Sequence, residues 1–156
     1  YAQLTPDDRA VIREAIESKG LGSYLRPGAK HGWERGGNNW NQVCHAGMAA
    51  GALALLEDDP QRATDVVSRA VAGLPYAMKV YEPDGTYPEG PSYWNYGTTL
   101  NVVLIATLES APANGQLRKT IARSGEPTKY AGMIAPHALP NTPRRTWQES
   151  AAPSVD

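Results

Sequence analysis

The pattern of apolar and polar positions predicts helices separated by polar loops rich in glycine and proline. A first helix is predicted over residues 5–19, because Thr5 can cap it and Pro6 suits the first helical position. The acidic pair that follows faces the positive end of the helix dipole. Gly20 and Gly22 are expected to end this helix in the left-handed conformation, and the aperiodic residues 23–39 then predict a long loop.

Three further apolar blocks predict a central set of helices. Residues 40–56 are apolar or small on nearly every side, which is typical of a helix surrounded by others. Residues 60–78 carry one apolar stripe opposite a polar face, so this helix is expected to lie outside the preceding one; Pro75 is expected to weaken or kink its last turn. The stripe consists of Ala63, Val66, Val67, Ala70, Val71, Leu74, Ala77 and Met78. A nearly continuous apolar run over residues 98–108 predicts a second inner helix.

The order of inner, outer and inner helix predicts an all-α fold of stacked antiparallel hairpins. Each inner helix follows a long polar loop, over residues 23–39 and 82–97, so both loops are expected to open on one rim. The helical domain is predicted over residues 1–112. Residues 113–156 contain several prolines and no sustained stripe, so we expect an irregular, partly disordered tail with at most a short helix over 116–123.

Charge and composition narrow the classes of partner. The chain has 156 residues, with 15 basic and 16 acidic side chains and a net charge of −1, so no broad positive field favours nucleic acid or an acidic membrane surface. Its longest apolar run is far too short to span a bilayer. The single Cys44 excludes an internal disulfide and is expected to pack within a helix. We predict no cofactor.

The first loop ends in three carboxamides and an indole, Asn38, Asn39, Trp40 and Asn41. Each amide offers two donors and one acceptor, which suits sugar hydroxyls or a carboxylate without adding a formal charge. The structural alternative is that one of these residues caps the following helix.

The second loop concentrates phenols, indoles and carboxylates. It contains Asp84, Tyr87, Glu89, Tyr93, Trp94 and Tyr96. Aromatic faces can stack on sugar rings, and a phenol can exchange a proton if its neighbours lower its pKa. The alternative is that the rings fill the rim beneath the loop while Asp84 forms a turn.

The three histidines do not form a metal motif. His31 lies in the first loop, where it could contact substrate or act as an acid or base, whereas His45 is expected to be a hydrogen-bonded core imidazole. His137 lies in the predicted tail. Their spacing matches no zinc signature, so no metal site is predicted.

Together, residues 38–48 (NNWNQVCHAGM) and 83–97 (PDGTYPEGPSYWNYG) resemble the helical domain of heparinase II/III-like proteins, which include alginate and heparin lyases. The resemblance covers about residues 1–112. It implies part of an (α/α) toroid, an acidic polysaccharide as partner, a periplasmic or secreted location, and cleavage of uronic-acid glycans by β-elimination. Family members are several times longer, so this chain is expected to be a fragment that holds part of the site.

The resemblance also implies roles for individual residues. β-Elimination requires neutralisation of the uronate carboxylate, a base for the C5 proton and an acid for the leaving oxygen. Carried over by motif, Asn39 would neutralise the carboxylate and Tyr93 or Tyr96 would be the acid or base. The expected substrate-binding residues are Asn38, Trp40, Asn41, Glu89, Trp94 and His31.

Two other functions remain open at this level. An α/α-toroid glycoside hydrolase would use Asp84 and Glu89 as acid and base, at separations characteristic of retention or inversion. A non-catalytic carbohydrate-binding or scaffold domain would use the aromatic residues for sugar contacts or for packing. Apolar flanks of a partial toroid would also favour a homo-oligomer.

Overall fold

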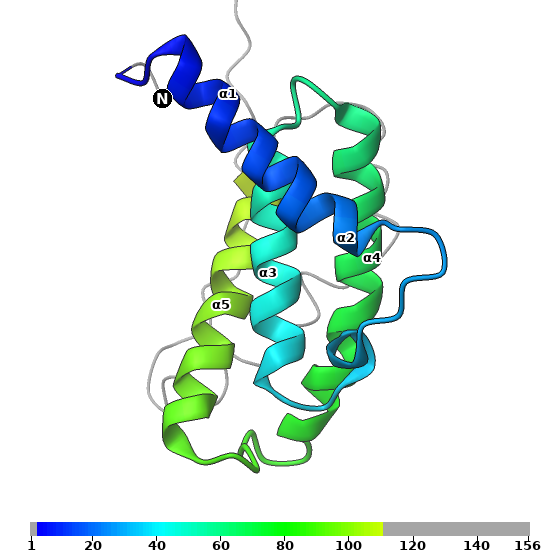
Figure 1. Ribbon diagram of the computed structural model, residues 1–156. Helices are drawn as coiled ribbons and strands as arrows, with labels where there is room; N and C mark the ends of the chain where they lie inside the picture. The colour runs from blue at the N-terminus through cyan, green and yellow to red at the C-terminus, as the bar shows by residue number, and fades with distance from the viewer. Residues whose placement is uncertain (1–2, 111–156) are drawn as a thin grey trace, which may run out of the picture.

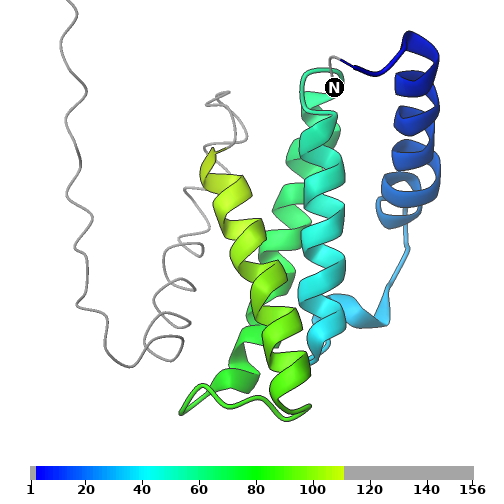
Figure 2. The ribbon, with the colours of Figure 1, turned by 90° about the vertical axis from the view of Figure 1, so that its left-hand side faces the viewer.

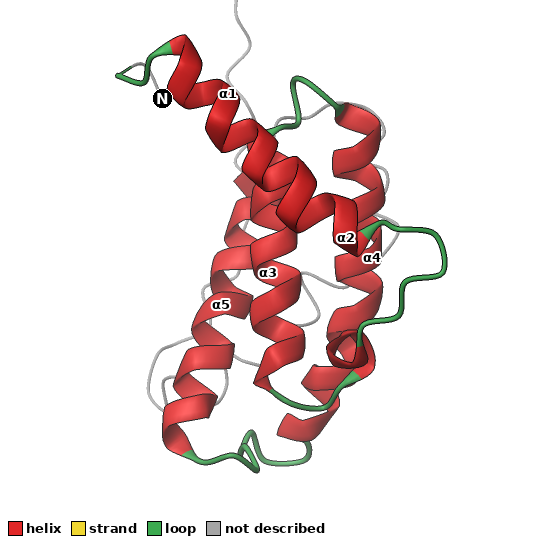
Figure 3. Cartoon of the chain, viewed as in Figure 1, coloured by secondary structure: helices red, strands yellow, loops and turns green. Residues whose placement is uncertain are grey.

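The computed structural model describes residues 3–110, and these residues form an all-α fold of antiparallel helices (Figures 1 and 3). The main helices are α1 (Pro6–Ala15), α3 (Asn39–Ala54), α4 (Pro60–Met78) and α5 (Pro91–Ser110). Short helical segments join them: η1 (Ile16–Leu21), α2 (Gly22–Tyr24), η2 (Gly32–Arg35) and η3 (Lys79–Tyr81). The described part of the chain contains no strand. The predictions for residues 113–156 lie outside the described residues.

The N-terminal helix begins as predicted but does not end as predicted. The Thr5 hydroxyl accepts the Asp8 N–H at 3.1 Å, and Asp8 accepts the Thr5 N–H at 3.0 Å, which forms a capping box. The prediction that Gly20 and Gly22 end this helix is wrong, because the chain continues through them as the π-helical η1 and then α2. A Cβ on Gly22 would lie 2.8 Å from the Glu17 carbonyl oxygen, so the wider helix requires glycine here for space.

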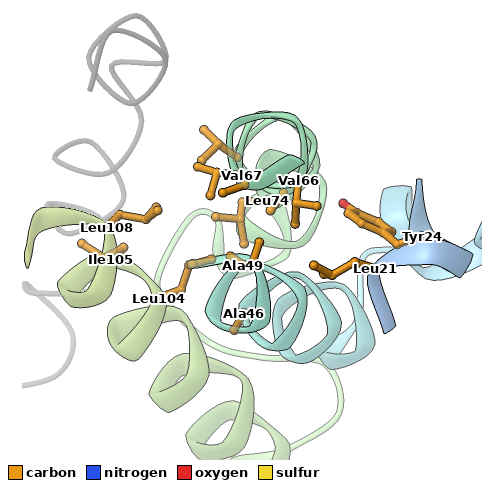
Figure 4. Close-up of a cluster of buried hydrophobic side chains, with 14 of the residues drawn as sticks. Leu21, Tyr24, Ala46, Ala49, Val66, Val67, Leu74, Leu104, Ile105 and Leu108 are labelled. Atoms are coloured by element: carbon orange, nitrogen blue, oxygen red, sulfur yellow. The ribbon is translucent and has the colours of Figure 1, made fainter. Parts of the chain in front are cut away.

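Helix α3 is central, as its apolar surface predicted. It lies between α4 and α5, and Figure 2 shows α1 and α5 on opposite sides of it. All eight residues of the predicted α4 stripe are buried. Figure 4 shows Val66, Val67 and Leu74 of α4 meeting alanines of α3 and leucines of α5. Small residues on α3 therefore let two neighbouring helices approach it closely.

Helix α5 starts earlier than predicted, so the second loop covers only residues 82–90. Pro91 occupies the first helical position after Gly90, whose φ is +87°, and the Trp94 N–H donates to the Gly90 carbonyl. Tyr93, Trp94 and Tyr96 are thus helical residues. The apolar run missed this start because residues 91–97 are mostly exposed in the helix, with Trp94 partly buried and Gly97 buried.

Both α3 and α5 begin at the end where α4 finishes (Figure 1). The prediction that the two polar loops share one rim is therefore confirmed. In the described residues one side of α5 stays open, with Val102 and Val103 about half exposed. No described helix is both long and apolar enough to cross a membrane.

Candidate functional site

One pair of residues joins the two sequence motifs. Asn39 is the first residue of α3, and Glu89 lies 50 positions later, just before α5. Glu89 Oε2 accepts the Asn39 backbone N–H at 3.1 Å and its side-chain Nδ2 at 2.8 Å. The carboxylate therefore lies at the start of α3, where free N–H groups and the helix dipole favour negative charge.

The Glu89 carboxylate is an anion at neutral pH. Desolvation raises the pKa of Glu89, but the two N–H groups of Asn39 and the neighbouring Tyr87 outweigh this effect and lower it overall. The Asn39 side chain is itself buried, with 4% of its surface exposed. A ligand carboxylate could accept a hydrogen bond from the Asn39 amide only if Glu89 moved away, because two carboxylates at one amide repel each other.

The other two carboxamides of the first motif have different surroundings. Asn38 is exposed and caps α3, since its Oδ1 accepts the Trp40 N–H at 3.2 Å. Asn41 is fully buried, and its Nδ2 donates to the carbonyl oxygens of Glu34 at 2.8 Å and Gly73 at 3.0 Å. The prediction that Asn41 contacts substrate does not fit this position, because its side chain faces α4 and the interior.

Three aromatic side chains of the motifs reach solvent at the rim. Trp40 is 62% exposed, Tyr93 50% and Tyr96 47%. Trp94 differs, because it is partly buried and its Nε1 donates to the Gly85 carbonyl at 2.9 Å, which holds the loop against α5. Trp40, Tyr93 and Tyr96 are thus available to a ligand, whereas Trp94 holds the second loop against α5. Because Tyr93 and Tyr96 are about equally exposed, exposure does not indicate which of them is the acid or base.

A polar layer beneath the rim was missed by the sequence reasoning. The Tyr81 hydroxyl accepts Gln42 Nε2 at 2.9 Å and lies 3.1 Å from Thr98 Oγ1, so it links α3, η3 and α5. The Tyr87 ring packs on Tyr81 with centroids 5.0 Å apart, and burial raises the pKa of Tyr87. Gln42 was the sequence signal that could have indicated this layer, because it lies three residues after Asn39 and therefore on the same side of α3.

The remaining predicted acid, Asp84, forms a turn. Its Oδ1 accepts the Thr86 N–H at 3.0 Å and the Thr86 hydroxyl at 2.7 Å. These contacts favour the turn interpretation of Asp84 over the acid–base pair.

The first loop folds against α4 through a partly buried ion pair that sequence reasoning missed. Arg69 donates from Nε to Glu34 Oε2 at 2.9 Å and from Nη2 to Glu34 Oε1 at 2.7 Å. It also donates to the backbone carbonyls of Tyr24 and Ala29, and its guanidinium lies 4.5 Å from the centre of the Tyr24 ring. This bidentate pair anchors the loop between α2 and α3 to the outer helix.

His45 is a core residue, as predicted. It is fully buried, its Nδ1 lies 3.2 Å from the Tyr24 hydroxyl, and its ring meets Trp33 edge-on at 4.9 Å between centroids. Desolvation lowers the pKa of His45 to about 4, so the imidazole is neutral at physiological pH.

His31 does not join the rim residues. Its ring stacks on Trp33 with centroids 5.5 Å apart, and it lines a cavity against α4 that includes Glu34, Arg69 and Tyr76. None of the other eight predicted site residues lines this cavity. The structure therefore divides the predicted residues between the rim and the cavity, with Asn41 in the interior between helices.

No protein-family model matches this chain, and no curated protein matches it. Among the described residues, no group of three or more His, Cys, Asp or Glu side chains is arranged to hold a metal ion. Function therefore has to be inferred from the rim and the cavity themselves.

Proposed function

We propose that this chain is the helical part of a heparinase II/III-like polysaccharide lyase that acts on uronic-acid glycans at the rim. The observation that carries the proposal is the hydrogen-bonded pair of Asn39 and Glu89, which joins the two motifs on which the resemblance rests. Trp40, Tyr93 and Tyr96 provide exposed aromatic surface at the starts of the same two helices. Part of an (α/α) toroid and a periplasmic or secreted location belong to the same proposal.

The proposed chemistry assigns the proton transfers to a phenol. The phenolate of Tyr93 or Tyr96 removes the C5 proton of the uronate, the electron pair forms a double bond in the ring, and the glycosidic bond breaks. The protonated phenol then supplies the proton to the leaving oxygen. Asn39 donates to the substrate carboxylate after Glu89 has turned away, which lowers the barrier by stabilising the developing charge.

A second candidate is glycan binding without turnover. It is favoured by one specific observation: in this structure Glu89 already occupies the Asn39 amide, while Trp40 and the two tyrosines stay exposed. Such a surface can stack on sugar rings through dispersion and CH–π contacts without any proton transfer.

The test is ultraviolet absorbance of the unsaturated uronate product during incubation with alginate, heparan sulfate, hyaluronan and polyglucuronate. We expect an increase with at least one polymer, abolished by Tyr93→Phe or Tyr96→Phe, whichever removes the reacting phenol. Tyr76→Phe is the matched control, because Tyr76 is 39% exposed but lines the cavity on α4.

Binding measured on the same samples separates the two candidates. The binding module would be established if the chain bound a polymer without any absorbance change. In that case Tyr93→Phe and Tyr96→Phe would leave the affinity unchanged, and Trp40→Ala would lower it. If the chain bound none of the four polymers and produced no absorbance change, both candidates would be contradicted.

A further inference from the structure

The cavity between the first loop and α4 has the size and chemistry of a ligand site. Its volume is about 860 Å³, within the range of cavities that hold small molecules. Residues 29–35 form one wall and the last three turns of α4 form the other. Its polar and aromatic lining residues are Lys30, His31, Glu34, Arg35, Arg69 and Tyr76.

The lining carries an excess of positive charge. Glu34 is its one acidic residue, and both carboxylate oxygens are engaged by Arg69, at 2.7 and 2.9 Å. This pair is neutral as a unit. Lys30 and Arg35 are exposed and add two positive charges, in a chain whose net charge is −1. The local charge therefore attracts an anion although the whole molecule does not.

A buried imidazole nitrogen also lacks a partner here. His31 Nε2 is inaccessible to solvent and has no hydrogen bond within the described part of the chain. No water-sized group reaches this nitrogen, so a ligand in the cavity would contact it only if the first loop moved. Tyr76 is 39% exposed, and the Arg35 guanidinium lies 5.7 Å from the centre of its ring, which gives the cavity an aromatic surface beside a cation.

We propose that this cavity binds the oxyanion of a monoester, a phosphate or sulfate ester of a small polyhydroxylated molecule. A tetrahedral oxyanion presents several acceptors, which suits the ammonium of Lys30 and the guanidinium of Arg35. The volume leaves room for a sugar-sized group against Tyr76. This proposal does not rest on the proposed function, because no residue of the rim lines the cavity. His31, which the sequence grouped with the rim residues, lies in the cavity.

Calorimetric titration of the whole chain with glucose 6-phosphate, N-acetylglucosamine 6-sulfate and unmodified glucose tests the proposal. We expect saturable binding of at least one ester and none of glucose. Binding of the phosphate ester alone identifies a phosphorylated metabolite as the ligand class, and binding of the sulfate ester alone identifies a sulfated sugar. Binding of both identifies a general monoester site.

Variants locate the binding. Lys30→Gln with Arg35→Gln is expected to weaken it by roughly tenfold or more, because two charge-assisted contacts are removed. Lys19→Gln with Arg26→Gln is the matched control, since both residues are exposed cations outside the cavity lining. The backbone amide signals of residues 29–35 are expected to shift on binding. Absence of saturable binding by either ester, equal binding of glucose, or equal loss in the control variant would overturn the proposal.

Discussion

The loops that precede α3 and α5 are both rich in glycine and proline, but each holds its key glutamate in a different way. In the first loop, Glu34 meets the guanidinium of Arg69, and the loop is held against α4 by a bidentate ion pair. In the second loop, Glu89 accepts from the two neutral N–H groups of Asn39 at the start of α3. The first acid is neutralised, and the second keeps its charge at the rim.

This difference explains why one loop supports the fold while the other presents a surface. Glu34 and Arg69 satisfy each other, and the Glu34 carbonyl also accepts from Asn41, so breaking this set exposes unpaired groups in the interior. Glu89 holds the start of α3 from outside, and exposed Tyr93 and Tyr96 follow it on α5. Changes to Glu34 should therefore affect mainly stability, and changes to Glu89 mainly glycan binding.

The largest loss of stability is expected from Gly73→Ala on α4. A Cβ at this position would lie 2.0 Å from His45 Nε2 and 3.0 Å from the Glu34 carbonyl oxygen, so the first loop and α3 would have to move. We expect the free energy of unfolding to fall by about 3 kcal/mol in urea denaturation. Gly47→Ala is the control, because no atom lies within 4 Å and alanine favours the helix. Equal effects of the two substitutions would contradict the close contact.

Removing the cation of the ion pair should cost somewhat less. Arg69→Gln leaves the partly buried Glu34 carboxylate without its bidentate partner, and we expect a loss of about 2 to 3 kcal/mol. Arg62→Gln, which removes exposed ion pairs with Asp59 and Glu17, should cost less than about 1 kcal/mol. If both variants were equally stable in urea, the first loop would not depend on its ion pair.

Acidification should weaken the same region through His45. Burial lowers its pKa to about 4, so in the native state it stays neutral while the unfolded chain takes up a proton near the ordinary value of 6.5. Stability is therefore present above pH 6.5 and falls as the pH decreases from there towards 4. Between pH 7 and pH 5 we expect a loss of about 2 kcal/mol from this residue. Urea denaturation of His45→Gln should lack that component, whereas His31→Gln should retain it.

The smallest effect on stability, and the clearest effect on binding, is expected from Glu89→Gln. The amide still accepts from Asn39, but the charge at the start of α3 is lost, which should cost about 1 kcal/mol or less. Affinity for oligoglucuronate should increase, because the anion that competes for the Asn39 amide is gone. Glu82→Gln, in the same loop, is the control for net charge. A lower affinity in Glu89→Gln than in Glu82→Gln would mean that Glu89 itself binds the sugar.

The fold could be predicted wherever one local pattern decided it. The α4 stripe identified its buried side residue by residue, and Thr5 and Asp59 marked the starts of α1 and α4. The start of α5 could not be placed by the apolar run, because most of residues 91–97 are exposed, Tyr93 and Tyr96 among them. Gly22 misled because glycine serves close approach as well as left-handed turns, whereas a Cβ on Gly20 would meet no atom within 4 Å.

The site was predicted less well, because its contacts join distant residues. Composition drew attention to Asn39 and Glu89, but no local rule pairs residues 50 positions apart. Helical geometry could have removed Asn41, since residues two apart on a helix point roughly 200° apart and cannot share a surface with Asn39. His31 was grouped with the rim by loop membership, while its stacking on Trp33 places it in the cavity.

The most direct test of the rim as the glycan site is chemical-shift mapping with an oligoglucuronate on the ¹⁵N-labelled chain. We expect saturable shifts of the Trp40 indole N–H and of backbone amides across residues 87–96, and the same pattern with larger affinity in Glu89→Gln. Shifts confined to residues 29–35 and 69–76, or no saturable shift, would contradict the account.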